Sequence, residues 1–187
     1  MIARSASVSG SSMSVANQAG VPERRRVTRW TKGGFVGVVA GALFMAVEMF
    51  LVRAFGNGSI WDPVRLSASI AIGSRTVTAS SPFTFDIFFI GMLVHFVLSI
   101  FYAVVLGMII RRLPVGLAIV IGGFYGLVLY AFHFYGLATF YPWVAGWRSW
   151  ITIVTHLVFG ISAAWVYSHL HMRQLMREAG LVSNSSS

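Results

Sequence analysis

Four ionisable side chains stand within stretches that are otherwise apolar enough for lipid: Glu48, His95, His133 and His156. Two neutral histidines with room between them are the axial ligands of b-type haem, and His95 and His156 are the predicted pair. All four residues together offer the imidazole and carboxylate ligands that iron, copper and zinc accept. A proton relay is the third chemistry, because intramembrane Glu and His residues exchange protons in pumps and transporters.

The alternative to a functional site is a structural role, in which these groups only form hydrogen bonds between helices. A charged carboxylate near the centre of a bilayer costs about 2.5–3.5 kcal/mol or more. Because of this cost, ionisable residues within a membrane are functional candidates, and we expect a ligand or proton site.

Transmembrane helices must position these residues. Of the 187 residues, 57% are hydrophobic and only 10% are charged, which indicates an integral membrane protein. Each long apolar run holds the roughly 20 residues that a helix needs to cross the hydrocarbon core. We predict an all-α, up-down bundle of four transmembrane helices that forms one membrane domain over residues 33–170. Its predicted spans are residues 34–55, 86–110, 115–136 and 149–169.

The net charge of +9 follows the membrane topology and does not indicate nucleic-acid binding. Most Arg and Lys residues near the spans lie on the side of the chain termini, so the positive-inside rule places both termini in the cytoplasm. We predict a bacterial inner-membrane protein whose main partner is the lipid bilayer. Residues 1–32 are predicted to be a disordered basic tail and residues 171–187 a second cytoplasmic tail.

The chain contains an internal duplication of a two-helix hairpin. GALFMAVE (41–48) corresponds to GLVLYAFH (126–133), and LVHFVLSI (93–100) corresponds to VTHLVFGI (154–161). Both copies enter the membrane from the same side, so we predict two parallel repeats. Small residues at four-residue spacing let neighbouring helices approach closely. The predicted packing residues are Gly37, Gly41, Gly91, Ser99, Gly107, Gly122, Gly126 and Gly160.

Depth within the bilayer relates the four ionisable residues to one another. Counted from the outer end of each span, at about 1.5 Å per residue, all four lie roughly 12–14 Å below the interface. In an up-down bundle the second and fourth spans are diagonal, as are the first and third. We therefore expect His95 to face His156 across the axis, and Glu48 to face His133.

The exterior loop over residues 56–85 contains the segment WDPVRLSASIAIG (61–73). Pro63 favours the first turn of a helix and Gly73 favours its end. We predict a short helix at the outer membrane interface, anchored by Trp61. A lid over the bundle is the alternative role for this loop.

Several chemistries are absent from the sequence. The chain has no cysteine, which excludes disulfides, thiolate catalysis and Cys-ligated metals. It also has no Walker motif, nucleophile elbow, HExxH motif or dinucleotide-binding glycine loop. We therefore assign no catalytic residue and do not expect the chain to be an enzyme by itself.

The order of Glu48, WDPVRLSASIAIG, LVHFVLSI and the later histidines resembles a family of small bacterial membrane proteins. Some members of that family are labelled sodium:proline symporters. The resemblance covers about residues 34–170 and implies no substrate. Four spans in parallel repeats also differ from the architecture of that class of transporter.

Three functions are consistent with these features. The first is a redox or accessory subunit that binds haem or a metal ion at the four ionisable residues. The second is a non-catalytic subunit that packs against other membrane subunits through its glycine faces. The third is a proton-coupled carrier of a small solute or ion.

Overall fold

The computed structural model describes residues 21–77 and 84–178, and all regular structure within these residues is helical. The long helices are α2 (Val21–Phe55), α4 (Phe85–Ile110), α5 (Val115–Ala131) and α6 (Trp150–Glu178). The shorter elements are α3 (Asp62–Ile72), η1 (Ser74–Val77), η2 (Phe132–Gly136), η3 (Leu137–Thr139) and η4 (Pro142–Trp147).

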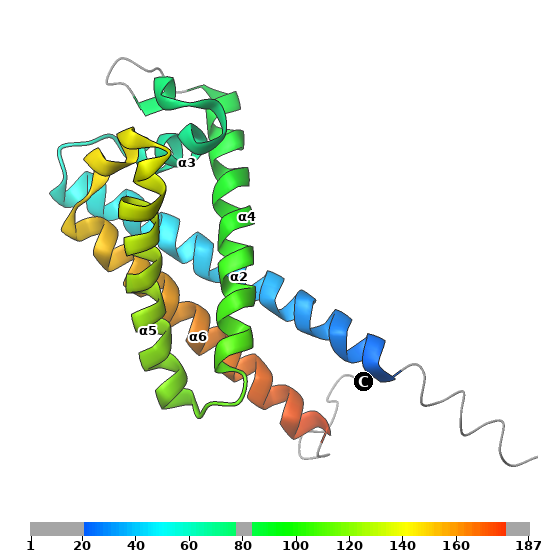
Figure 1. Cartoon of the computed structure of the whole chain (residues 1–187). Helices are drawn as coiled ribbons and strands as arrows, with labels where there is room; N and C mark the ends of the chain where they lie inside the picture. Colours follow the sequence, from blue (N-terminus) through cyan, green and yellow to red (C-terminus); the bar gives the residue numbers. More distant parts are fainter. Residues whose placement is uncertain (1–20, 78–83, 179–187) are drawn as a thin grey trace, which may run out of the picture.

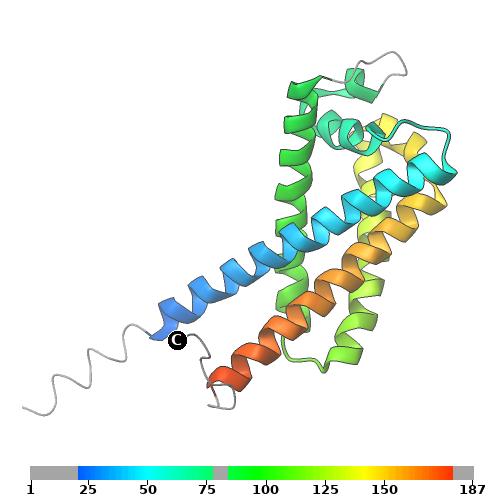
Figure 2. The same cartoon turned by 180° about the vertical axis from the view of Figure 1, so that it is seen from behind.

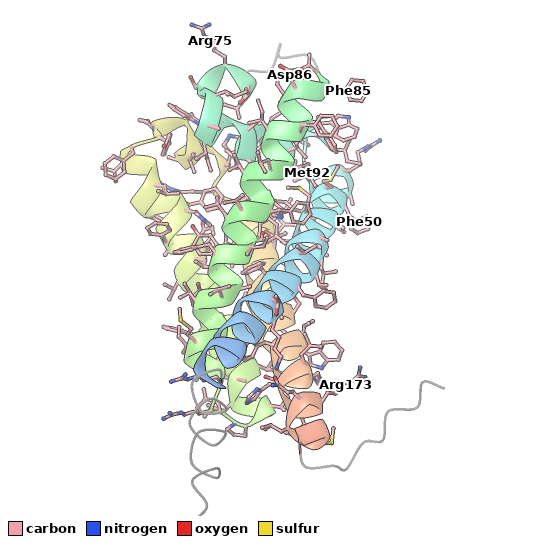
Figure 3. All side chains as sticks on the ribbon, turned by 90° about the vertical axis from the view of Figure 1, so that its right-hand side faces the viewer. Phe50, Arg75, Phe85, Asp86, Met92 and Arg173 are labelled. Carbon is pink, nitrogen blue, oxygen red and sulfur yellow. The ribbon has the colours of Figure 1, made fainter. Side chains whose placement is uncertain are left out.

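Four helical segments are long and apolar enough to cross a membrane, which confirms the predicted number of spans. Their limits are Thr31–Phe55, Phe85–Ile110, Val115–Thr139 and Trp150–Met176. Many large apolar side chains on these helices point outward, as expected of helices that face lipid. Phe50 and Phe85 are examples, at 65% and 75% exposure (Figure 3).

The structure differs from the predicted N-terminal tail in the residues that it describes. Residues 21–32, predicted to be disordered, form the start of α2, and residues 171–178 continue α6. Arginine favours the helical state, and Pro22 occupies the first turn, where a missing N–H breaks no helical hydrogen bond. The rest of both predicted tails lies outside the described residues.

The four long helices run alternately up and down. The start of α2, the turn between α4 and α5, and the end of α6 lie at one end of the molecule (Figure 1). Helix α3 and the short helices of residues 132–147 lie at the other end. Arg173 and Arg75 mark these two ends (Figure 3). Helices α2 and α6 run beside each other and cross α4 and α5 at an angle (Figures 1 and 2).

The closest helix contacts lie within two hairpins. A Cβ atom at Gly37 of α2 would collide with the backbone of Ile100 on α4. Gly122 of α5 and Gly160 of α6 likewise leave each other no room for a Cβ atom. Helices α2 and α6 also pack closely, whereas α4 and α5 have few contacts despite the short turn that joins them. Backbone contact therefore fixes the hairpins α2/α4 and α5/α6.

The two ends of the bundle differ in their interior. Leu106, Ile110 and Ala118 are almost fully buried close to the α4–α5 turn. Toward the other end α3 lies across the bundle, and the carbonyl group of its buried Val64 packs against Gly91 of α4. The side of the bundle near α3 encloses a cavity, which holds the candidate site.

A side-chain hydrogen bond connects α3 to the segment before α6. The Nε1 atom of Trp143 in η4 donates to the Ser69 hydroxyl of α3 over 2.9 Å. Helix α3 ends at Gly73, whose φ of 92° is a conformation that L side chains rarely adopt. Helix α3 is thus packed on α4 and linked to η4, and it covers the end of the cavity.

Candidate functional site

The four ionisable residues predicted from the sequence line one cavity of about 100 Å³. Glu48, His95 and His156 are buried, and His133 is half-buried. They come from α2, α4, α6 and η2, and α3 contributes the wall at the end of the bundle. The remaining wall is mainly apolar, and its aromatic members are Phe44, Tyr102, Phe134 and Phe159.

Glu48 supplies the only carboxyl group of the cavity wall. It lies on α2 seven residues after Gly41, which places both on the face that packs against α4. The side chain is 6% exposed. Within residues 31–77 and 84–176, whose side chains are described, no hydrogen bond or ion pair to its carboxyl group is found. The cavity is therefore the place where a partner for this group has room to bind.

His95 on α4 is held by the backbone of α2. Its Nε2 atom lies 2.9 Å from the carbonyl oxygen of Gly41 and 3.5 Å from the hydroxyl of Ser99. A carbonyl oxygen only accepts hydrogen bonds, so Nε2 carries the proton and donates it to Gly41. In the uncharged ring the Nδ1 atom is then an acceptor.

His133 stands in a single π-helical turn, Phe132–Gly136, that continues α5. Turns of this kind are frequent at functional sites. Arg148 supports the turn from outside: its Nε atom donates a 2.8 Å hydrogen bond to the carbonyl oxygen of Phe134. Its guanidinium group also lies 4.2 Å from the centre of the Tyr135 ring. These contacts fix the backbone that carries His133.

Three side chains form a hydrogen-bonded chain that ends on the backbone of α6. The Tyr102 hydroxyl lies 2.9 Å from Nε2 of His133. Nδ1 of His133 lies 3.0 Å from Nε2 of His156. Nδ1 of His156 lies 2.7 Å from the carbonyl oxygen of Thr152.

The carbonyl group at the end of this chain determines the direction of every bond in it. Because the Thr152 oxygen only accepts, Nδ1 of His156 is the donor, and Nε2 of an uncharged His156 must accept. His133 therefore donates from Nδ1 and accepts at Nε2. The hydroxyl of Tyr102 must then donate to His133. Donation runs in one direction, from Tyr102 to Thr152.

The pairing of the histidines differs from the expected one. His156 bonds to His133 and not to His95 across the axis. Phe44 of α2 packs against both members of the diagonal pair: its ring centre is 5.3 Å from that of His95 and 5.1 Å from that of His156. Close packing of α5 on α6 explains the observed pair, since Gly126 brings α5 against the backbone of His156.

The positions of the cavity side chains and the cavity volume limit which metal ions or cofactors could bind there. Among the residues that the structure describes, no three His, Asp or Glu side chains are arranged around a common metal position. His133 and His156 use both ring nitrogens in hydrogen bonds, so each would have to break one to bind a metal. The volume of about 100 Å³ is also well below the roughly 300–1,000 Å³ of typical pockets for drug-sized ligands. The arrangement fits a small ion or molecule better than haem.

Two members of the hydrogen-bonded chain were not among the residues singled out from the sequence. Tyr102 follows His95 by seven residues and so shares its helix face. Thr152 precedes His156 by four residues, the spacing at which a side chain reaches a backbone carbonyl of the preceding turn. Both spacings are visible in the sequence.

Comparison with protein-family models, with curated proteins and with solved structures found no match for this chain.

Proposed function

We propose that this protein is a proton-coupled membrane carrier whose cavity binds and transfers protons. The observation that carries the proposal is the directional hydrogen-bonded chain from Tyr102 through His133 to His156, beside the unpaired carboxyl group of Glu48. Intramembrane relays in pumps and transporters are built from such Asp, Glu and His groups.

The chain supports proton transfer because each imidazole ring accepts at one nitrogen and donates from the other. A proton that arrives at Nε2 of His133 releases the Nδ1 proton toward His156, so charge moves without movement of the ring. The carbonyl group of Thr152 is too weak a base to accept a proton, so the transfer ends at His156. An ionised Glu48 in the same cavity offsets the resulting positive charge, which reduces the cost of holding it within a membrane.

Proton movement across vesicles tests this function. Purified protein is reconstituted in liposomes that contain a pH-sensitive dye, and a potassium gradient with valinomycin imposes a membrane potential. We expect the wild-type protein to acidify the lumen several-fold faster than protein-free vesicles. The variants Glu48→Gln and His133→Gln should return the rate to background.

The matched control is His169→Gln, which removes an exposed histidine near the end of α6 that bonds only to its own helix at Trp165. It should keep the wild-type rate. A wild-type rate equal to that of protein-free vesicles, or equal rates in all variants, would overturn the proposal.

Metal binding is the second candidate function, favoured because three imidazoles and one carboxylate line the same cavity. Glu48 and Nδ1 of His95 are the groups that an iron, copper or zinc ion would reach without breaking a hydrogen bond. Elemental analysis of the purified protein tests it, and loss of bound metal in Glu48→Gln would support it. The same sample tests haem binding through its visible absorbance.

A role as a non-catalytic subunit remains a prediction, and it leads to a different experimental result. Partner membrane proteins would copurify with this chain in fixed ratio, whereas a carrier needs none. The exposed glycine faces required for such packing are few, because a Cβ at Gly37, Gly122, Gly126 or Gly160 would meet other helices of the same chain. The carrier is therefore the better-supported alternative.

We also infer that the two hairpins are copies of one unit. Gly41 approaches His95 in the hairpin α2/α4, and Gly126 approaches His156 in the hairpin α5/α6. In addition, each glycine stands seven residues before an ionisable residue: Gly41 before Glu48, and Gly126 before His133. This equivalence supports a duplication, and it agrees with the correspondence of GALFMAVE with GLVLYAFH.

The proposed placement is in the bacterial inner membrane, with both termini in the cytoplasm. The basic residues Arg111, Arg112 and Arg173 lie at the same end of the molecule as the start of α2, as the positive-inside rule requires of the cytoplasmic end. Helix α3 then lies at the outer interface. Its buried residues and its place in the cavity wall support a covering role there in addition to an interfacial one.

A further inference from the structure

The hydrogen-bonding groups of the cavity are unequally used. The donors of Tyr102, His133, His156 and His95 are all directed to other groups of the protein. The hydroxyl of Ser67 likewise donates to the carbonyl oxygen of Pro63 over 3.0 Å. Ser99, which packs against Gly41, is the one lining side chain with a hydroxyl proton not directed in this way.

The acceptors, in contrast, are left available. The Glu48 carboxyl group has no hydrogen-bond partner among the described residues. Nδ1 of His95 is an acceptor because Nε2 donates to Gly41. The Tyr102 oxygen still has lone pairs after it donates to His133. A ligand that fits this wall must therefore supply the donors.

Charge leads to the same class of ligand. No Arg or Lys side chain lines the cavity, so an ionised Glu48 is its only full charge of fixed sign. A buried carboxylate without a partner is costly, and a cation beside it offsets that cost. The rings of Phe44, Phe134 and Phe159 also line the cavity, and the face of an aromatic ring attracts a cation. An anion would meet no positive charge and, among the described lining side chains, only the Ser99 hydroxyl as a donor.

Size and geometry narrow the class further. A volume of about 100 Å³ is below the roughly 150 Å³ of an engineered cavity that binds benzene, so the cavity suits a ligand of a few heavy atoms. A transition-metal ion needs several ligand atoms at about 2.0–2.3 Å from one point, and the described residues contain no such group of three. Acceptors spread around a small cavity instead suit N–H donors, whose hydrogen bonds span about 2.7–3.2 Å.

We propose that the cavity binds a small ammonium-type cation, such as ammonium or methylammonium, with Glu48 as its counter-ion. This inference names the substrate class of the carrier proposed above and rests on that function. Glu48 accepts one N–H group of the cation, and His95 and Tyr102, which line the same cavity, each keep an acceptor for another. If the Tyr102 oxygen took a proton from the cation while Tyr102 passed its own proton to Nε2 of His133, the cation would become a neutral amine and the two events would be coupled.

Binding of methylammonium chloride to the purified protein in lipid nanodiscs, measured by calorimetry, tests the proposal. Sodium chloride, tetramethylammonium chloride and zinc chloride are titrated in parallel. We expect saturable binding of methylammonium and none of sodium or of tetramethylammonium, which is larger and has no N–H donor. Glu48→Gln should weaken binding by more than about tenfold, because a buried charge loses its partner.

Two further variants keep the test decisive. Glu48→Asp retains the charge and should restore part of the affinity that Glu48→Gln loses, which separates a binding role from a folding role. His169→Gln changes a histidine outside the cavity wall, so it should bind methylammonium with wild-type affinity. Each variant must unfold cooperatively before its binding is compared.

Three results would overturn the proposal: no binding of methylammonium by a folded protein, equal binding by Glu48→Gln, or saturable binding of zinc in place of methylammonium. Binding of methylammonium without proton movement in vesicles would leave this inference standing and remove the proposed function. Proton movement by a protein that does not bind methylammonium would do the reverse.

Discussion

Nδ1 of His133 lies 3.0 Å from Nε2 of His156, and this contact joins the π-helical turn after α5 to the second turn of α6. The bond has a fixed direction because the other nitrogen of His156 faces the carbonyl oxygen of Thr152.

The tautomers of the three cavity histidines are the first prediction. His133 and His156 should carry their proton on Nδ1, and His95 should carry its proton on Nε2. Nitrogen-15 NMR of the protein in lipid distinguishes the two tautomers, and removal of one histidine at a time assigns the resonances. An Nε2–H tautomer at His156 would contradict the chain of hydrogen bonds.

Loss of the Tyr102 hydroxyl should act on His133. Tyr102→Phe leaves Nε2 of His133 without its donor, so we expect a changed His133 resonance and a loss of about 1 kcal/mol of stability. The matched control is Tyr125→Phe, because the Tyr125 hydroxyl donates only to the backbone oxygen of Tyr102, over 3.1 Å. That variant should leave the His133 resonance in place. Equal spectral changes in both variants would count against the chain.

Close backbone packing predicts that two neighbouring glycines respond differently to the same substitution. Gly37→Ala would place a Cβ against the Ile100 backbone and should destabilise the protein by about 1–3 kcal/mol. Gly34→Ala meets nothing within 4 Å, so it should leave stability unchanged or raise it slightly. Unfolding of both variants in detergent measures the difference. Equal effects would mean that α2 and α4 do not meet at Gly37.

Arg148 should stabilise the turn that carries His133. Arg148→Gln removes a hydrogen bond to the Phe134 carbonyl group and a contact with the Tyr135 ring. We expect faster hydrogen exchange over residues 132–137 and a loss of about 1 kcal/mol. Arg53→Gln, which changes another exposed arginine at the same end of the molecule, should leave that exchange unchanged. The reverse order of effects would show that the turn does not need this support.

The buried carboxyl group of Glu48 should lower the free energy of unfolding of the protein. A buried carboxyl group without a partner is unfavourable, so Glu48→Met should raise the unfolding temperature and add about 1–4 kcal/mol. Asp86→Asn, at an exposed carboxyl group near the start of α4, should give no such gain. Thermal unfolding in detergent measures both. A destabilised Glu48→Met would indicate that the carboxyl group has a structural partner.

The long apolar runs were enough to predict four spanning helices, because the bilayer fixes the length of a span. The sequence also led to the four residues that line the cavity, since an ionisable group within an apolar helix has few other places to lie. Periodicity alone was not enough to find the pairing of His133 with His156. That pairing depends on the close approach of α5 to α6 at Gly126 and on one π-helical turn, and the π-helical turn leaves no pattern in the spacing of residues.

The start of α2 shows a different limit. Residues 21–32 were assigned to a tail because their charges mark the edge of a span, yet they continue the helix. Basic residues indicate where the membrane-spanning part of a helix ends, but they do not indicate where the helix itself ends. The remainder of both tails lies outside the described residues, so its structure stays a prediction.

The glycine contacts have a mechanical consequence. Gly37 meets Ile100, and Gly122 meets Gly160, so neither hairpin is able to slide internally without a clash of main-chain atoms. Helices α4 and α5, from different hairpins, touch only slightly. Any exchange of the cavity contents with the outside would therefore require the two rigid hairpins to tilt against each other. The contact between α2 and α6 would act as the pivot, and α4 and α5 would separate.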